Sequence, residues 1–269
     1  MKITVNGHGL YAYTGGKAFD AAKPTVVFIH GVLNDHSVWI LQSRWFAHHG
    51  WNVLAIDLPG HCKSGGKPPA SVEEAAQTVI ALLDATGVQR AALVGHSFGS
   101  LIALETAARA PDRVSHLAMV GTAYPMKVSP ALLESSLNEP QKAIAMVNMF
   151  SHSTLAPPLG PGAWLYGSSR ALMRRVLNSN RDANVFHIGF NACNGYTNGE
   201  AAIDALACPV LFLLGKGDQM TLASAAKPLI SRARDAKVVM VPAGHALMGE
   251  APEEVLFALA DFLKGPSGA

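Results

Sequence analysis

Short apolar runs rich in β-branched residues alternate along this chain with longer stretches rich in alanine and leucine. The short runs are typical of strands buried on both faces of a parallel sheet, and the longer stretches are typical of helices with one apolar face. This alternation predicts an α/β architecture. The expected strands cover residues 25–31, 52–60, 90–95, 114–121, 208–215 and 237–242, and the expected helices cover residues 37–50, 71–87, 100–113, 221–233 and 252–264.

Two parts of the chain do not follow this alternation of strand and helix patterns. Residues 2–13 form two alternating segments joined at Asn6–Gly9, which predicts an opening hairpin. Between Gly121 and the strand expected at 208–215, the sequence carries prolines, glycines, methionines and helical patterns but no strand pattern. We therefore expect a helical insertion within a single sheet-based domain.

The composition fits a compact folded protein. Hydrophobic residues make up 49% of the 269 positions and charged residues 15%, which argues against disorder. The net charge is +2 and no run of basic residues exceeds Arg174–Arg175, so nucleic acid is not an expected partner. The sequence has no H-E-x-x-H motif, no paired-cysteine spacing and no phosphate-binding loop, so we expect neither a metal nor a cofactor.

The cysteines and the hydropathy of the chain indicate the cellular compartment in which the protein is expected. The three cysteines, Cys62, Cys193 and Cys208, form no C-x-x-C pair, which fits a reducing compartment. The first residues alternate in polarity and do not resemble a signal peptide, and no segment is long and apolar enough to span a membrane. We expect a cytoplasmic protein, with monomer and homodimer both left open.

The segment GHSFG at residues 95–99 matches the Gly-x-Ser-x-Gly pattern. In a chain with 25 glycines such a match is moderately specific by itself. Here it follows an expected strand and opens an expected helix, and the sharp turn at such a junction presents the serine hydroxyl above the sheet edge. Glycines at 95 and 99 let the strand and the helix approach closely. We predict that Ser97 is a nucleophile rather than a helix cap.

A serine nucleophile needs a base and an acid that orients it. Asp218 lies in the loop after the strand at 208–215, and His245 lies after the strand at 237–242. Because ligands of α/β sheets bind at the carboxyl ends of the strands, both side chains can converge there with Ser97. Either residue alone could be an ordinary loop residue, but the order Ser, Asp, His at these strand ends predicts a catalytic triad.

The triad also needs two backbone N–H groups that bind the oxyanion. The N–H of Phe98 follows the nucleophile directly, and the N–H of Val32, in the loop after the strand at 25–31, is the expected second donor. Gly31 lets this loop approach the substrate, and we expect His30 to brace the loop through side-chain hydrogen bonds. Five further histidines are expected to be structural or solvated: His48, His49, His61, His96 and His116.

Together these motifs resemble the α/β-hydrolase superfamily, and in particular its small cap-bearing members, which include carboxylesterases. The resemblance covers nearly the whole chain. It rests on HG at 30–31, DLPGH at 57–61, GHSFG at 95–99, GKGD at 215–218 and GH at 244–245. It implies an eight-stranded, mostly parallel sheet with helices on both faces. It also implies a hydrolase core over residues 1–124 and 206–269 and a helical cap over residues 125–205.

The nucleophile narrows the reaction that the resemblance implies. Haloalkane dehalogenases and epoxide hydrolases resemble this pattern but use an aspartate where this chain has Ser97. Carbon–carbon bond hydrolases usually carry a tryptophan, and hydroxynitrile lyases a lysine, near the catalytic histidine, where this chain has Ala246 and Leu247. We expect the substrate to be a small, apolar carboxylic ester, cleaved through an acyl-enzyme. A carbon–carbon bond or other non-ester hydrolase, and a ligand-binding protein with slow turnover, remain as alternatives.

Apolar residues near the triad and in the cap are candidates for the substrate pocket. Because methionine and aromatic residues are more often ordinary core, we expect about a third of these candidates to line the pocket. The candidates are Leu33, Trp39, Phe98, Met126, Phe150, Trp164, Met220, Leu247 and Met248.

Overall fold

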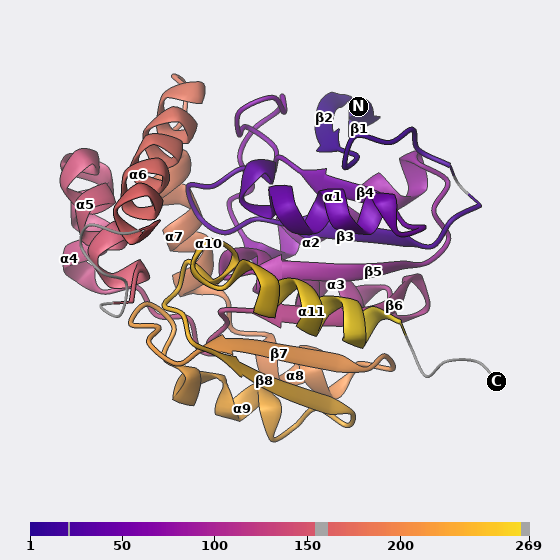
Figure 1. Cartoon of the computed structure of the whole chain (residues 1–269). Helices are drawn as coiled ribbons and strands as arrows, with labels where there is room; N and C mark the ends of the chain where they lie inside the picture. The colour runs from indigo at the N-terminus through magenta and orange to yellow at the C-terminus, as the bar shows by residue number, and fades with distance from the viewer. Residues whose placement is uncertain (21, 154–160, 265–269) are drawn as a thin grey trace.

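An eight-stranded sheet runs through the centre of the molecule (Figure 1). The computed structural model describes residues 1–20, 22–153 and 161–264, apart from the side chains of residues 161–164. The strand order is β1-β2-β4-β3-β5-β6-β7-β8; β1 pairs antiparallel with β2 and β2 with β4, and all other pairs are parallel. The strands are β1 (Lys2–Val5), β2 (His8–Tyr13), β3 (Thr25–Ile29), β4 (Asn52–Ile56), β5 (Ala91–His96), β6 (Val114–Val120), β7 (Val210–Gly215) and β8 (Ala236–Val241).

The central strands are buried on both faces, which explains their continuous apolar sequences. Val27 and Leu93 point to one face and pack with α2 (Val72–Ala85) and α3 (Phe98–Arg109). Val26 and Phe28 point to the other face, where α1 (Ile40–His48), α10 (Leu247–Glu250) and α11 (Pro252–Leu263) cover the sheet. The two apolar cores hold the sheet edge rigid where the candidate site lies.

Between β6 and β7, the described residues form five helices. They are α4 (Pro130–Asn138), α5 (Pro140–Ser151), α6 (Pro161–Ser179), α7 (Val185–Gly195) and α8 (Gly199–Asp204). Figure 1 shows α4 to α7 gathered at one end of the sheet. These four helices share a third apolar core, which includes Ile144, Val176 and Phe186, and Leu33 from the loop after β3 belongs to the same core. The insertion is therefore anchored directly on a loop of the sheet.

The α/β-hydrolase architecture expected from the sequence is confirmed, but two helices differ from their expected form. The helix expected at 37–50 begins with a 3₁₀ turn, η1 (His36–Trp39), and continues as α1. The helix expected at 221–233 is reduced to a 3₁₀ turn, η3 (Ala223–Ala226), and the single turn α9 (Lys227–Ile230). Pro228 lies at the start of α9 and supplies no backbone N–H, which limits continuation of a helix through this position.

Among the described residues, none of the helices combines the length and the hydropathy needed to cross a membrane.

Candidate active site

Ser97 lies at the turn between β5 and α3, in a backbone conformation that few residues other than glycine adopt. Its φ is +52° and its ψ is −119°. The flanking glycines are required by space, because a Cβ on Gly95 would lie 2.0 Å from the carbonyl oxygen of Gly99. A Cβ on Gly99 would lie 2.4 Å from the carbonyl oxygen of Ile29 in β3. The turn thus has the strained strand-to-helix geometry of a nucleophile elbow.

Asp218 and His245 are hydrogen-bonded to one another at the ends of β7 and β8. Asp218 Oδ2 lies 2.8 Å from His245 Nδ1, and both side chains are buried. The loops that carry them pack backbone to backbone: the N–H of Gly217 donates to the carbonyl of Ala243 over 2.9 Å, and a Cβ on Gly215 would lie 2.4 Å from the carbonyl oxygen of Gly244. The structure therefore brings together the two side chains that the sequence placed on separate loops.

Thr221 completes the surroundings of the carboxylate, and the sequence analysis did not single it out. Its hydroxyl lies 2.8 Å from Asp218 Oδ2 and 3.1 Å from His245 Nδ1, and its backbone N–H donates to Asp218 Oδ1 over 2.8 Å. Burial alone would raise the pKa of Asp218. The charge and hydrogen bond of His245, with the bonds from Thr221, outweigh burial and lower that pKa, so the carboxylate is favoured.

The loop after β3 reaches the serine closely. A Cβ on Gly31 would lie 3.1 Å from Ser97 Cβ. The bracing predicted for His30 is confirmed: its Nδ1 bonds to the carbonyl of Gly31 over 2.8 Å, and its Nε2 accepts the N–H of Leu58 over 3.1 Å. Burial lowers the pKa of His30, which disfavours its charged form. Within the described chain, the backbone N–H groups of Val32 and Phe98 donate to no protein acceptor.

His96 ties the serine turn to the loop of His245. Its Nε2 lies 2.9 Å from the carbonyl oxygen of His245, so it donates there, and its fully buried ring has a pKa lowered to about 3 by burial and by the neighbouring His245. Of the two roles expected from the sequence, structural or solvated, His96 has the structural one.

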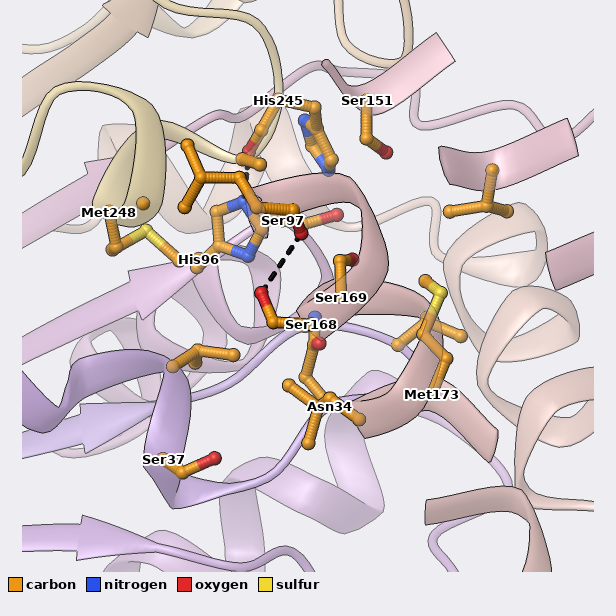
Figure 2. Close-up of a pocket in the computed structure, with 18 of the residues that line it drawn as sticks. Asn34, Ser37, His96, Ser97, Ser151, Ser168, Ser169, Met173, His245 and Met248 are labelled. Carbon is orange, nitrogen blue, oxygen red and sulfur yellow. Dashed lines mark hydrogen bonds between the residues drawn. The ribbon is translucent and has the colours of Figure 1, made fainter. Parts of the chain in front are cut away.

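Two cavities meet at Ser97 and His245. The larger has a volume of about 690 Å³ and the smaller about 270 Å³, and both are lined by Val32, Ser97, Met220 and His245. Figure 2 shows Ser97 and His245 around the larger cavity together with Ser168, Ser169 and Met173 of α6. No hydrogen bond joins Ser97 to His245 among the described residues, and in unliganded hydrolase sites this bond is often long.

The pocket candidates from the sequence separate into three groups. Met126 and Phe150 line the smaller cavity, Met248 lines the larger and Met220 lines both. The side chain of Trp164 lies outside the described residues. The remaining four are buried and line neither cavity: Leu33, Trp39, Phe98 and Leu247.

These four corrections have a common physical reason, which is packing into an apolar core. Trp39 and Leu247 belong to the core on the α1 face of the sheet, and Phe98 belongs to the opposite core. Leu33, with φ +56°, turns its side chain into the core of the insertion. Large side chains gain more by full burial than by lining a hydrated pocket.

Asp35, His36 and Asp57 are the candidate metal group among the described residues, with donor atoms within 4.8 Å of one another. These atoms already have protein partners. His36 Nδ1 lies 2.7 Å from Asp57 Oδ1, Ser37 donates its backbone N–H to Asp35 Oδ1 over 2.8 Å, and Arg175 donates to Asp35 Oδ2 over 2.5 Å. We therefore assign this group to ordering the loop after β3.

Comparison with known proteins agrees with this geometry. A family model described as the alpha/beta hydrolase fold matches residues 24–144. The enol-lactonase of Burkholderia xenovorans LB400 superposes with a TM-score of 0.85 over 98% of this chain and 100% of that protein, at 21% identity. This chain has the α/β-hydrolase fold.

Two curated relatives show how this chain compares in sequence with known proteins. It is 35% identical over 99 residues to a dihydrolipoyllysine-residue acetyltransferase component of an acetoin cleaving system from Pseudomonas putida, a match that covers 36% of this chain and 26% of that relative. It is 26% identical over 263 residues to the mouse sn-1-specific diacylglycerol lipase ABHD11, covering 91% of this chain and 82% of the lipase. The second match extends over both the sheet and the helical insertion.

Proposed function

We propose that this protein is a serine hydrolase that cleaves carboxylic esters with an apolar acyl part through an acyl-enzyme. The observation that carries the proposal is the bond of 2.8 Å between Asp218 and His245 beside a cavity that both His245 and Ser97 line. The mouse relative, which is named as a lipase, agrees with ester chemistry.

In the proposed reaction, His245 removes the proton of the Ser97 hydroxyl while the serine oxygen attacks the ester carbonyl. The negative charge on the carbonyl oxygen is bound by the N–H groups of Val32 and Phe98. The carbon–oxygen bond to the alcohol breaks, and His245 gives its proton to the departing alcohol. Asp218 holds the imidazole in the correct tautomer and stabilises its cation.

Water completes the cycle. His245 removes a proton from a water molecule that attacks the acyl-enzyme, the bond to Ser97 breaks, and the proton returns to the serine oxygen. The carboxylic acid then leaves, and the enzyme is restored without a metal or cofactor taking part in any step.

The test of the proposed function is hydrolysis of p-nitrophenyl butyrate by the wild type and two serine variants. Ser97→Ala removes the attacking oxygen and should lower kcat by at least about 10³-fold, since the loss of a triad member leaves only binding and oxyanion stabilisation. Ser231→Ala changes an exposed serine after α9 and should retain wild-type activity. Circular dichroism and thermal melting establish that both variants fold. Normal turnover by folded Ser97→Ala would overturn the proposed function.

A further inference from the structure

The two cavities that meet at Ser97 differ in size and in the polarity of their openings. We propose that the larger cavity holds an aliphatic acyl chain of medium length, about eight carbons, and that the smaller cavity holds the alcohol part of the ester. This inference rests on the proposed function. It names the class of substrate as an ester with one long acyl arm and one short alcohol arm.

The walls of the larger cavity suit a hydrocarbon chain. They include Leu172 and Met173 of α6, Phe186 and Phe190 of α7, and Met248 of α10. The volume of about 690 Å³ lies within the range of sites that enclose whole ligands and is more than a short acyl group needs. A chain placed there replaces water with apolar contacts over most of its length.

The charge of this cavity is neutralised within the protein. Arg175 is the one charged side chain among its described lining residues, apart from the titratable histidines, and its guanidinium is bound to the buried carboxylate of Asp35. The exposed side chains of Ile40 and Leu41 add apolar surface to the rim of this cavity, which also carries the exposed Ser168 and Arg175 of α6. The ion pair with Asp35 reduces the net charge that Arg175 presents to the cavity.

The opening of the smaller cavity carries three exposed polar side chains beside the exposed Phe150. Lys127, Ser129 and Gln219 line it and are exposed to solvent. An alcohol released there passes directly into water. With a volume of about 270 Å³, the smaller cavity offers less than half the space of the larger one.

The order of steps assigns the acyl chain to the larger cavity. After the alcohol leaves, the acyl group stays attached to Ser97 and continues to fill its own cavity. Water must then reach the acyl carbon near His245 through the space that the alcohol has vacated. The cavity with the polar, exposed opening meets this requirement.

The assignment predicts a dependence on acyl length. Each methylene group moved from water into an apolar cavity contributes about 0.8 kcal/mol, which corresponds to about a fourfold gain in kcat/KM per added carbon. From methyl butyrate to methyl octanoate, kcat/KM should therefore rise by at least about tenfold, allowing for incomplete burial.

The experiment compares methyl butyrate, methyl octanoate and heptyl acetate by titration of the released acid. Methyl octanoate and heptyl acetate are isomers, so they have equal carbon counts but carry the long chain on opposite sides of the ester. We expect kcat/KM for methyl octanoate to exceed that for heptyl acetate by at least about tenfold. A flat acyl series, or a preference for heptyl acetate, would overturn the inference while leaving ester hydrolysis established.

Two tryptophan variants on α6 test whether the dependence of kcat/KM on acyl length arises in the larger cavity. Ser169→Trp projects an indole into the larger cavity and should reduce the ratio of kcat/KM for methyl octanoate to that for methyl butyrate by about tenfold. Asn178→Trp places the same side chain at an exposed position of the same helix, away from both cavities, and should keep the wild-type ratio. An unchanged ratio in folded Ser169→Trp would contradict the assignment of this cavity. If none of the three esters were hydrolysed, the result would instead contradict the proposed function, ester hydrolysis.

Discussion

Single residues set the geometry of the serine turn. Ser97 holds a φ of +52°, and glycines on both sides allow β5 and α3 to approach until their backbones are nearly in contact. The strained conformation is kept because the two apolar cores hold the strand and the helix in place. At this scale the site depends on the absence of two Cβ atoms as much as on the presence of three polar side chains.

A prediction at this scale concerns Gly95. Gly95→Ala would place a Cβ 2.0 Å from the carbonyl oxygen of Gly99, and since backbone cannot move aside cheaply, the free energy of unfolding should fall by about 3 kcal/mol. Gly167→Ala is the matched control, because Gly167 lies exposed within α6 with no atom near its Cβ position. That change should raise the free energy of unfolding by up to about 1 kcal/mol. Denaturant titration measures both values, and equal effects would refute this account of Gly95.

The same scale shows what the sequence could and could not predict about the site. Ser97, Asp218 and His245 each lie within four residues of a strand end, so the topology alone brings them to one edge, and the structure places them there. Thr221 was missed because an aspartate followed by a threonine three residues later is common in turns. The difference between lining residues and core residues depends on how the insertion packs, and the sequence pattern does not specify that packing.

At the scale of elements, an ion pair and a hydrogen bond join the helical insertion to the loops that form the candidate site. Arg175 of α6 pairs with Asp35 in the loop after β3, and the carbonyl of Ser151 in α5 accepts the N–H of Ala246 over 2.9 Å. These contacts join the insertion to the loop after β3 and to the loop that carries His245. The insertion therefore forms a wall of the cavities whose position relative to Ser97 is held by specific bonds.

The Asp35 contact predicts a pH dependence of stability. Burial alone would raise the pKa of Asp35, but bonds from Ser37 and the bond and charge of Arg175 lower it to about 2. Because the folded-state pKa lies below the ordinary value of 3.8, the contribution is present above about pH 4 and is lost as the pH falls towards 2. A shift of this size corresponds to at most about 2 kcal/mol.

Asp35→Asn provides the measurement, because asparagine still accepts the N–H of Ser37 but carries no charge. Unfolding by urea between pH 5 and pH 2.5 should show a smaller loss of stability in the variant than in the wild type. Parallel loss in both proteins would mean that other carboxylates account for the acid sensitivity.

Helices and strands were predicted well where hydrophobic residues recur along the sequence with a clear periodicity. The buried strands and the helix that begins after Ser71 lie within two to four residues of their expected bounds, and the side chain of Ser71 accepts the N–H of Glu74 as its capping pattern predicts. The expected helix at 221–233 is shortened to the adjoining turns η3 and α9 over residues 223–230, and of these residues only Ala226 and Leu229 are buried.

At the scale of the whole molecule, the candidate active site lies between a rigid sheet edge and a helical insertion. The sheet supplies Ser97, Asp218 and His245, and the insertion supplies most of the apolar wall of the larger cavity. This division separates the proposed chemistry from the proposed choice of substrate. Changes on α6 should alter which ester is cleaved, whereas changes at the strand ends should alter whether any ester is cleaved.

The measurement that tests the central claim most directly is the intact mass of the protein after treatment with a fluorophosphonate, which reacts with activated serine hydroxyls. The wild type and Ser97→Ala are treated in parallel, and the modified residue is located by peptide mapping. We predict a single adduct on the wild type, at Ser97, and none on the variant. An adduct on both proteins, or none on either, would contradict the claim that Ser97 is an activated nucleophile.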